Sequence, residues 1–173
     1  MRSEELLNLK VVDIESGTTI GTITGMLIDG ESKRMVALQV GGSFLTHADY
    51  VPFADIKATE NDVVMITSAS SVVGRGTFKH AGMVDKLIDR KVLTIDGKDI
   101  GTVHDYDVDI ATGEIKSISV ACDTAVMGGL WQSAGERFDI PRSQVMTLGE
   151  SVVIDKSVKD IRKADKAAAS KRR

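Results

Sequence analysis

Aromatic residues are scarce in this sequence, where phenylalanine, tyrosine and tryptophan together make up 4% of 173 residues. A hydrophobic core must therefore be built mainly from valine, isoleucine, leucine and methionine. The single cysteine, Cys122, excludes an intramolecular disulfide and fits a reducing compartment. No apolar run approaches the roughly 18 residues of a membrane span, and the N-terminal stretch carries acids where a signal peptide would be apolar. These absences predict a soluble, cytoplasmic protein without a membrane span.

The net charge of −3 hides an uneven distribution along the chain. Residues 156–173 contain eight basic and two acidic residues, a charge of +6, and the remaining 14 basic and 23 acidic residues give −9. Because contact with phosphates needs clustered positive charge, the acidic body is not typical of a nucleic-acid-binding surface. The basic tail, which has apolar residues at helical spacing, is the candidate for weak contact with RNA or an anionic surface.

The chain contains an internal repeat. A stretch that opens with Ile-Gly-Thr, reaches an aspartate and turns into an alternating apolar run occurs twice. The matched landmarks are Ile20-Gly21 with Ile100-Gly101 and Asp29 with Asp109 at an offset of 80, and Pro52 with Pro141 at an offset of 89. We therefore expect a first domain at 1–68, a linker at 69–82, a second domain at 83–155 and a basic C-terminal tail at 156–173.

Both units show the alternation of apolar and polar residues that is typical of β-strands. Gly21 and Gly25 interrupt the long strand of the first unit, as a bulge or a barrel corner would. Each proline is expected to end a strand and to open a short turn. Short helices are predicted before each unit, at residues 3–8 and 82–90. The pattern predicts an all-β protein with two small antiparallel barrels in tandem and a basic tail that is helical or frayed.

The segments KVLTIDGKDIGTVHDYDVDIATGEI and DIPRSQV, with their counterparts in the first unit, resemble the PRC-barrel family. That family takes its name from the cytoplasmic domain of the photosynthetic reaction-centre H subunit. It also includes the C-terminal domain of a ribosome-maturation factor and many prokaryotic proteins. The resemblance implies a small β-barrel used for protein–protein contact, with no catalytic residues. This sequence lacks the transmembrane helix of the H subunit and the N-terminal RNA-associated domain of the ribosome factor.

The sharpest local pattern is HDYDVD, in which Asp105, Asp107 and Asp109 would share one face of a strand. Three carboxylates there could hold Ca²⁺ or Mg²⁺. However, Ile110 and Lys116 stand where a calcium loop needs glycine and glutamate. We favour a solvated face followed by a turn that the repeated aspartate caps, and keep metal binding as the weaker alternative.

The longer loop of the second unit contains the only tryptophan, Trp131, close to Leu130 and Met127. An apolar cluster in such a loop suits a partner-binding anchor, because tryptophan is enriched at interface hot spots. The alternative is that Trp131 folds back to plug its own barrel or the groove between the units.

The sequence has no phosphate-binding glycine loop, paired-cysteine zinc motif or nucleophile elbow. Small barrels of this size fill their interiors with side chains, so that function is expected on outer faces, edges and long loops. The expected contact surfaces are the loop around Trp131 and the groove between the units. The sequence predicts a non-enzymatic cytoplasmic adaptor or assembly protein without a cofactor, whose protein partner is unknown. A homodimer is left open. The alternative is a ribosome-associated or RNA-metabolism factor that acts through residues 156–173.

Overall fold

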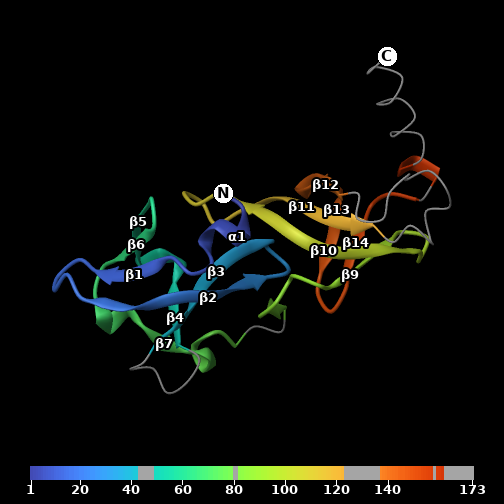
Figure 1. The fold of residues 1–173 in the computed structure, drawn as a ribbon. Coiled ribbons are helices and arrows are strands. Elements are labelled where there is room, and N and C mark those ends of the chain that lie inside the picture. Colours follow the sequence, from blue (N-terminus) through green and yellow to red (C-terminus); the bar gives the residue numbers. More distant parts are fainter. Residues whose placement is uncertain (43–48, 80–81, 123–136, 158, 162–173) are drawn as a thin grey trace, which may run out of the picture.

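The computed structural model describes residues 1–42, 49–79, 82–122, 137–157 and 159–161. It contains two β-sheets, one for each predicted unit, and Figure 1 shows the first (blue to green) beside the second (yellow to orange). The all-β fold class is confirmed. In the described part of the chain, no helix has the length and apolarity needed to cross a membrane.

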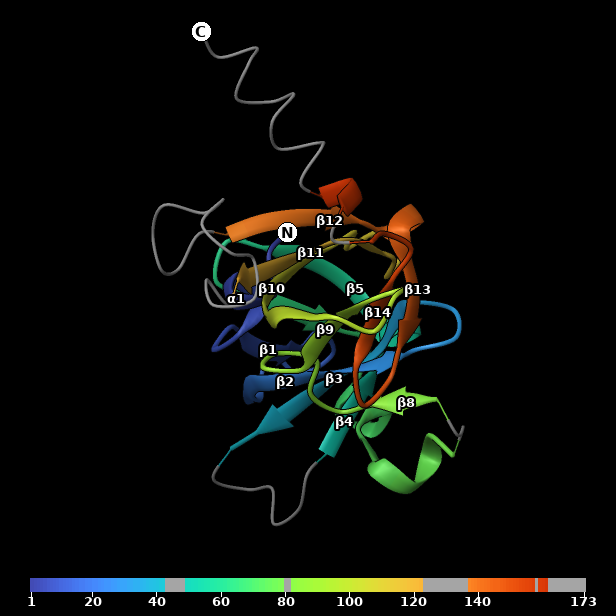
Figure 2. The ribbon, with the colours of Figure 1, turned by 90° about the vertical axis from the view of Figure 1, so that its right-hand side faces the viewer.

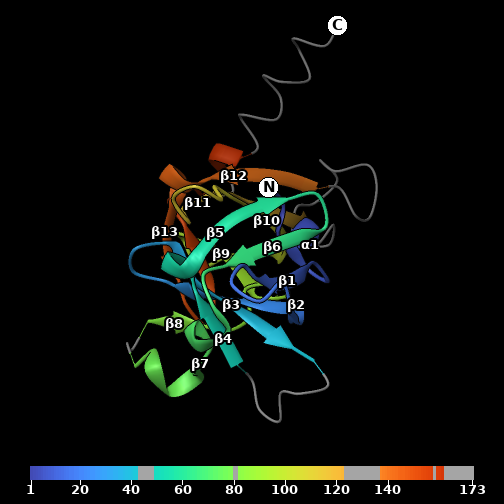
Figure 3. The same cartoon turned by 90° about the vertical axis from the view of Figure 1, so that its left-hand side faces the viewer.

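The first sheet contains eight strands in the order β5-β6-β1-β2-β3-β4-β7, with β8 paired to β2. Figure 3 shows β5 and β6 in front of the other strands of this unit. The elements from the start of the chain to β8 are α1 (Ser3–Leu6), β1 (Lys10–Asp13), β2 (Thr19–Asp29), β3 (Arg34–Gly41), β4 (Asp49–Pro52), the 3₁₀ turn η1 (Phe53–Asp55), β5 (Ile56–Glu60), β6 (Val63–Ile66), η2 (Ala69–Ser71), β7 (Val73–Gly74), η3 (Arg75–Thr77) and β8 (Met83–Val84).

The second sheet contains six strands in the order β12-β11-β10-β9-β14-β13. Its elements are β9 (Lys91–Thr94), β10 (Asp99–Val108), β11 (Ile115–Cys122), β12 (Arg137–Pro141), η4 (Arg142–Gln144), β13 (Val145–Leu148) and β14 (Val152–Ile154). As predicted, each proline ends a strand and a short 3₁₀ turn follows it. The long strands β2 and β10 are bulged at equivalent places, including the predicted bulge at Gly25 and its counterpart before Asp105.

Two expectations about local structure are wrong. The barrels are not wholly antiparallel, because β1 pairs in parallel with β6, and β9 pairs in parallel with β14. Alternation predicts a strand but not the direction of its neighbour. The helix expected at residues 82–90 is absent, and Met83–Val84 form β8, which pairs with β2 at Ile28 and Asp29.

The segment at the start of each unit contacts the sheet of the other unit. While β8, which leads into the second unit, pairs with β2 of the first, Arg2 bridges to Asp107 in β10 of the second unit. The helix α1 lies against the same strand, and the Asp105 carboxylate accepts hydrogen bonds from the backbone N–H and the hydroxyl of Ser3 at its first turn. Strand β8 therefore extends the first sheet, whereas Arg2 and α1 lie against β10 of the second sheet.

Equivalent residues meet where the two units join. Arg34 and Glu114, which are 80 residues apart, form a β-bridge, and the guanidinium lies 2.6 Å from the carboxylate. On either side, the N–H of Met35 donates to Gly113 O at 2.7 Å and that of Ile115 donates to Lys33 O at 3.1 Å. Because 33 corresponds to 113 and 35 to 115, the junction has local two-fold symmetry at this bridge.

Reversing one charge at this bridge is expected to weaken the junction. In Arg34→Glu, two carboxylates would face each other, and we expect a loss of about 0.5–1 kcal/mol because both side chains are partly exposed. The double variant Arg34→Glu/Glu114→Arg should recover most of this loss in urea unfolding. Lys98→Glu, the same charge change in an exposed turn, is the control. Equal losses in the single and double variants would contradict a direct charge pair.

The units share a hydrophobic core. One cluster of buried side chains extends from Leu6, Ile28 and Leu38 in the first unit to Val108 and Ile118 in the second. Because a single cluster crosses the boundary, neither unit buries its apolar residues alone.

The segment predicted as a linker also contributes to the fold. Its strand β7 pairs with β4 at Asp49 and Tyr50, and the Phe78 ring lies edge-on to Tyr50 with 5.9 Å between ring centroids. Val73 and Phe78 pack on a small outer cluster formed by Leu27, Ala37 and Tyr50. This segment therefore both connects the units and covers one edge of the first sheet.

Candidate functional site at the junction of the two units

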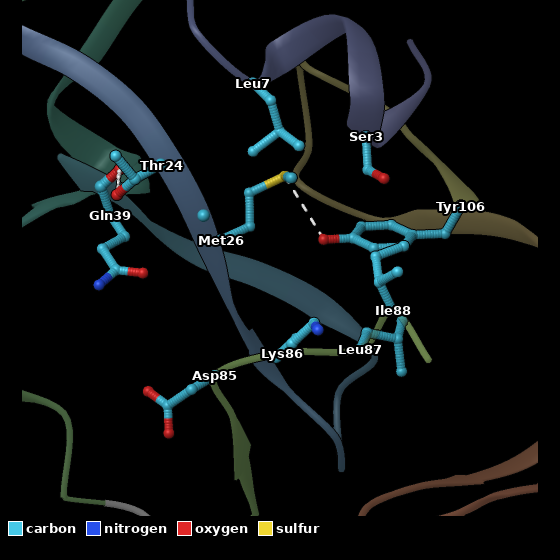
Figure 4. A pocket seen from close by; sticks show the side chains of 11 residues that line it. Ser3, Leu7, Thr24, Met26, Gln39, Asp85, Lys86, Leu87, Ile88 and Tyr106 are labelled. Carbon is cyan, nitrogen blue, oxygen red and sulfur yellow. Dashed lines mark hydrogen bonds between the residues drawn. The ribbon is translucent and has the colours of Figure 1, made fainter. Parts of the chain in front are cut away.

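The long strands β2 and β10 bring Met26 and Tyr106, another pair of equivalent residues, into contact. The Tyr106 hydroxyl donates a hydrogen bond to the Met26 sulfur at 3.5 Å (Figure 4). The Tyr106 side chain is almost fully buried, with 2% exposed. Its burial, with the charge of Asp105, raises the pKa of this phenol, and only the Ser3 hydroxyl acts in the opposite direction.

A hollow of about 280 Å³ opens beside this pair. It is lined by residues of both units, and its lining is mainly apolar. Figure 4 shows Ser3 and Leu7 on one side of Met26 and Tyr106, with Asp85 and Lys86 on the other. The full set of lining residues is Ser3, Leu7, Thr24, Gly25, Met26, Gln39, Asp85, Lys86, Leu87, Ile88 and Tyr106. We call this the apolar hollow.

A second hollow of similar size lies at the equivalent place in the second unit. It is lined by Arg2, Glu4, His104, Asp105, Ser119, Arg137 and Asp139. At the offset of 80, Thr24, Gly25 and Gln39 of the apolar hollow correspond to His104, Asp105 and Ser119 here. We call this the polar hollow. The same scaffold position therefore carries different chemistry in the two units.

Three charged groups of the polar hollow, Arg2, Asp105 and Asp139, lie in contact with one another. The Arg2 guanidinium donates to both carboxylate oxygens of Asp139, at 3.3 and 2.9 Å, and lies 3.9 Å from Asp105. This contact, more than any other, lowers the pKa of the Asp139 carboxyl, against the effect of its partial burial. The hollow thus holds the Arg2 guanidinium between Asp139 and Asp105, and the second arginine of its lining is Arg137.

The three aspartates of HDYDVD have separate partners. Asp105 is 5% exposed and binds Ser3, whereas Asp107 accepts from the amino group of Met1 at 2.6 Å. Asp109 lies beyond the end of β10. Within the described ranges, no group of three or more His, Cys, Asp and Glu side chains could hold a metal ion. The expectation of a solvated face is wrong for Asp105, because α1 of the first unit covers it.

The repeated aspartate caps a turn in both units, as predicted. The Asp109 carboxylate accepts from Ala111 N at 2.9 Å, and Asp29 accepts from Glu31 N at 3.0 Å. The Ala111 N–H and the nearby Lys116 ammonium lower the pKa of Asp109. What the two copies retain here is turn geometry.

Other candidate residues lie outside the described residues. They are Trp131, Leu130 and Met127 of the long loop, and most of the basic tail from residue 162 onward. The choice between a contact anchor and a plug stays a prediction. The tail is described as far as Ile161, which packs against the shared core. Cys122 is buried at the end of β11.

Sequence reasoning pointed to the groove between the units but did not identify the residues of the apolar hollow. Its residues come from α1, β2, β3, the segment after β8 and β10, so no short motif contains them. The one available signal was the pairing of Met26 with Tyr106 at the repeat offset, which becomes informative only once the units are known to face each other.

Comparisons with known proteins agree with the repeat. The PRC-barrel domain matches the chain twice, at residues 1–73 and 83–161. A comparison with curated proteins finds no match. The two matched ranges cover most of the chain and correspond to the two sheets. The chain therefore belongs to the PRC-barrel family and contains two copies of its domain in tandem.

Proposed function

We propose that the protein is a non-enzymatic cytoplasmic adaptor or assembly protein that binds other proteins through its tandem PRC-barrel domains. The observation that carries the proposal is the divergence of equivalent surfaces on a repeated scaffold. The hollow formed at Thr24, Gly25 and Gln39 is mainly apolar, and its counterpart contains His104 and Asp105. The repeated arrangement of strands thus presents two unlike surfaces, which suits an adaptor that contacts more than one partner.

The lining of the apolar hollow supports contact with protein. It has apolar walls from Leu7, Met26 and Ile88 and a rim that includes Gln39 and Lys86. An apolar centre within a polar rim is the usual composition of a protein-binding surface. The PRC-barrel family is a non-catalytic domain type, which also favours binding over chemistry.

Direct binding of a purified partner tests this proposal. The tagged chain is used to capture proteins from the source organism after nuclease treatment, and each captured protein is purified and titrated against the chain. We expect Lys86→Glu/Gln39→Ala, on the rim of the apolar hollow, to weaken binding about tenfold, a loss of about 1.4 kcal/mol. Lys98→Glu, in a distant exposed turn, should bind as the wild type does. Thermal unfolding of each variant checks that the fold is intact.

The alternative function, an RNA- or ribosome-associated factor, is favoured by the charge of +6 in residues 156–173. It predicts capture that nuclease abolishes and that falls steeply as salt is raised. The adaptor proposal would be replaced by this one if no purified protein bound the chain and if ribosomes were captured only without nuclease.

A further inference from the structure

The turn between β2 and β3 closes the edge of β13, the end strand of the second sheet (Figure 2). The Lys33 ammonium donates to the Val145 carbonyl oxygen, and the Arg142 guanidinium donates to Ser32 O at 3.0 Å. Lys33 makes this contact from a backbone with φ of 56°, a left-handed conformation that residues with a side chain adopt only at a cost. The edge of β13 thus receives a lysine side chain from the other unit.

The equivalent place in the first unit, at the edge of β5, lacks these contacts. At the repeat offsets, Gly113 stands in place of Lys33, Phe53 in place of Arg142 and Ile110 in place of Gly30. Gly113 has no side chain that could reach Ile56, the counterpart of Val145. A Cβ on Gly113 would lie 2.8 Å from the backbone oxygen of Met35, so the chain cannot readily supply a lysine here.

A hollow of about 280 Å³ lies at this edge of β5. It is lined by Phe53, Ile56, Lys57, Ala58, Thr59, Ile110 and Ala111, and we call it the β5 hollow. The Thr59 hydroxyl is buried and has no hydrogen-bond partner among the residues that the structure describes. Because such a group loses its hydration without replacement, a bound molecule that pairs with it gains free energy.

The charges around the β5 hollow leave room for a cation. On the β5 side, Lys57 is accompanied by the carboxylates of Asp55 and Glu60, a net charge of −1 for residues 53–60. In the β10–β11 turn, the carboxylates of Asp109 and Glu114 are each paired with a basic side chain. Lys57 is therefore the one unfavourable group, and its side chain is exposed.

We propose that the β5 hollow binds a lysine side chain from an extended segment of a protein partner. Its ammonium donates to the Ile56 carbonyl oxygen, as Lys33 does at the equivalent carbonyl of the second unit. Its aliphatic stem packs on Phe53 and Ile110, and a backbone group of the same segment pairs with the Thr59 hydroxyl. This inference rests on the proposed adaptor function and names the side chain that one surface receives.

The probe is a short acetylated peptide, Ser-Val-Lys-Val-Ser, which is titrated into the full chain up to millimolar concentration and followed by amide NMR shifts. We expect the shifts at residues 56–59 and 110–111. Norleucine in place of the lysine keeps the stem but removes the ammonium. It should weaken binding about tenfold, because hydrogen bonds from a charged group are the strong ones. A glutamate peptide should bind more weakly still.

Protein variants test the hollow itself. Ala58→Phe fills it from an exposed position of β5 and should weaken binding of the lysine peptide about tenfold. Thr147→Phe, at the equivalent exposed position of β13, should bind as the wild type does. Thr59→Val should weaken binding several-fold yet leave the free chain at least as stable, because it removes a buried hydroxyl that has no partner. Thermal melts check each fold, and Thr59→Val keeps the test decisive if Ala58→Phe does not fold.

Several results would overturn the assignment. They are a lysine peptide that does not bind, a norleucine or glutamate peptide that binds as tightly, shifts outside the β5 hollow, and unchanged binding by folded Ala58→Phe. Loss of stability in Thr59→Val would mean that the hydroxyl serves the fold and would remove its part in binding. If a purified partner binds wild type and Ala58→Phe equally, the adaptor function stands and only this hollow is wrong.

Discussion

Gly30→Ala is expected to lower the free energy of unfolding by at least about 3 kcal/mol. A methyl group on Gly30 would lie 2.0 Å from the backbone oxygen of Leu148 and 3.0 Å from that of Gly82. Neither neighbour is a flexible side chain that could turn away. Gly30 belongs to the first unit and Leu148 to β13 of the second, so the added carbon must separate the units or break the turn.

Gly76→Ala is the matched control, because a methyl group there would have no neighbour within 4 Å. Its stability should stay within about 0.5 kcal/mol of the wild type. Urea unfolding followed by far-UV circular dichroism measures both variants. A Gly30→Ala protein as stable as the control would show that the β2–β3 turn does not pack against β13. The size of the expected loss reflects the shared core, since moving this turn also exposes buried side chains of both units.

The repeat allowed much of the fold to be predicted. Alternation located the long hairpins, the prolines located the ends of β4 and β12, and the repeated aspartates located two turns. These features are local, because a turn, a bulge or a strand end is determined by a few neighbouring residues.

The errors concern contacts between distant residues. Residues 82–90 have helical spacing, but Met83 and Val84 pair with β2 of the other unit, and that partner outweighs the local preference. The parallel pairing of β1 with β6 likewise depends on how the chain returns through β4 and β5. The partner and the direction of a strand are determined by tertiary structure, and the residues of the strand itself carry little information about them.

The candidate site was predictable only in part. The sequence pointed to the groove between the units and to the places where the copies differ. It did not reveal that Met26 meets Tyr106, or that equivalent positions line an apolar hollow in one case and a polar hollow in the other. Both findings follow from combining the repeat with the observed symmetry at Arg34 and Glu114.

Tyr106→Ala is expected to cost about 3–5 kcal/mol, the usual range for removing a buried aromatic ring. Tyr106 is 2% exposed and belongs to the core cluster shared by the two units. Its replacement would join the space left by the ring to the apolar hollow. Tyr106→Phe keeps the ring and removes a hydrogen bond to a weak sulfur acceptor, so its cost should stay within about 1 kcal/mol. Urea unfolding of the three proteins measures the difference.

Burial of Tyr106 also predicts a loss of stability at high pH. The pKa of its phenol is raised in the folded protein, mainly by burial, whereas in the unfolded chain it loses its proton near pH 10. Above that pH the unfolded state binds fewer protons than the folded state, so stability falls as pH rises and is unaffected below it. The pKa of Tyr50, the other tyrosine, is also raised, chiefly by burial and then by the charge of Asp85.

Absorbance at 295 nm, which reports phenolate, separates the two tyrosines. In the folded wild type Tyr106 should not titrate near pH 10, and its signal should appear with unfolding. In Tyr106→Phe the fall in melting temperature above pH 10 should be smaller, because the tyrosine with the larger upward shift of its pKa is gone. A Tyr106 that ionises reversibly near pH 10 without unfolding would show that water reaches its hydroxyl through the apolar hollow. That result would also contradict the tight burial of Tyr106 on which the large expected effect of Tyr106→Ala depends. The pH titration and the unfolding measurement therefore test the same structural claim.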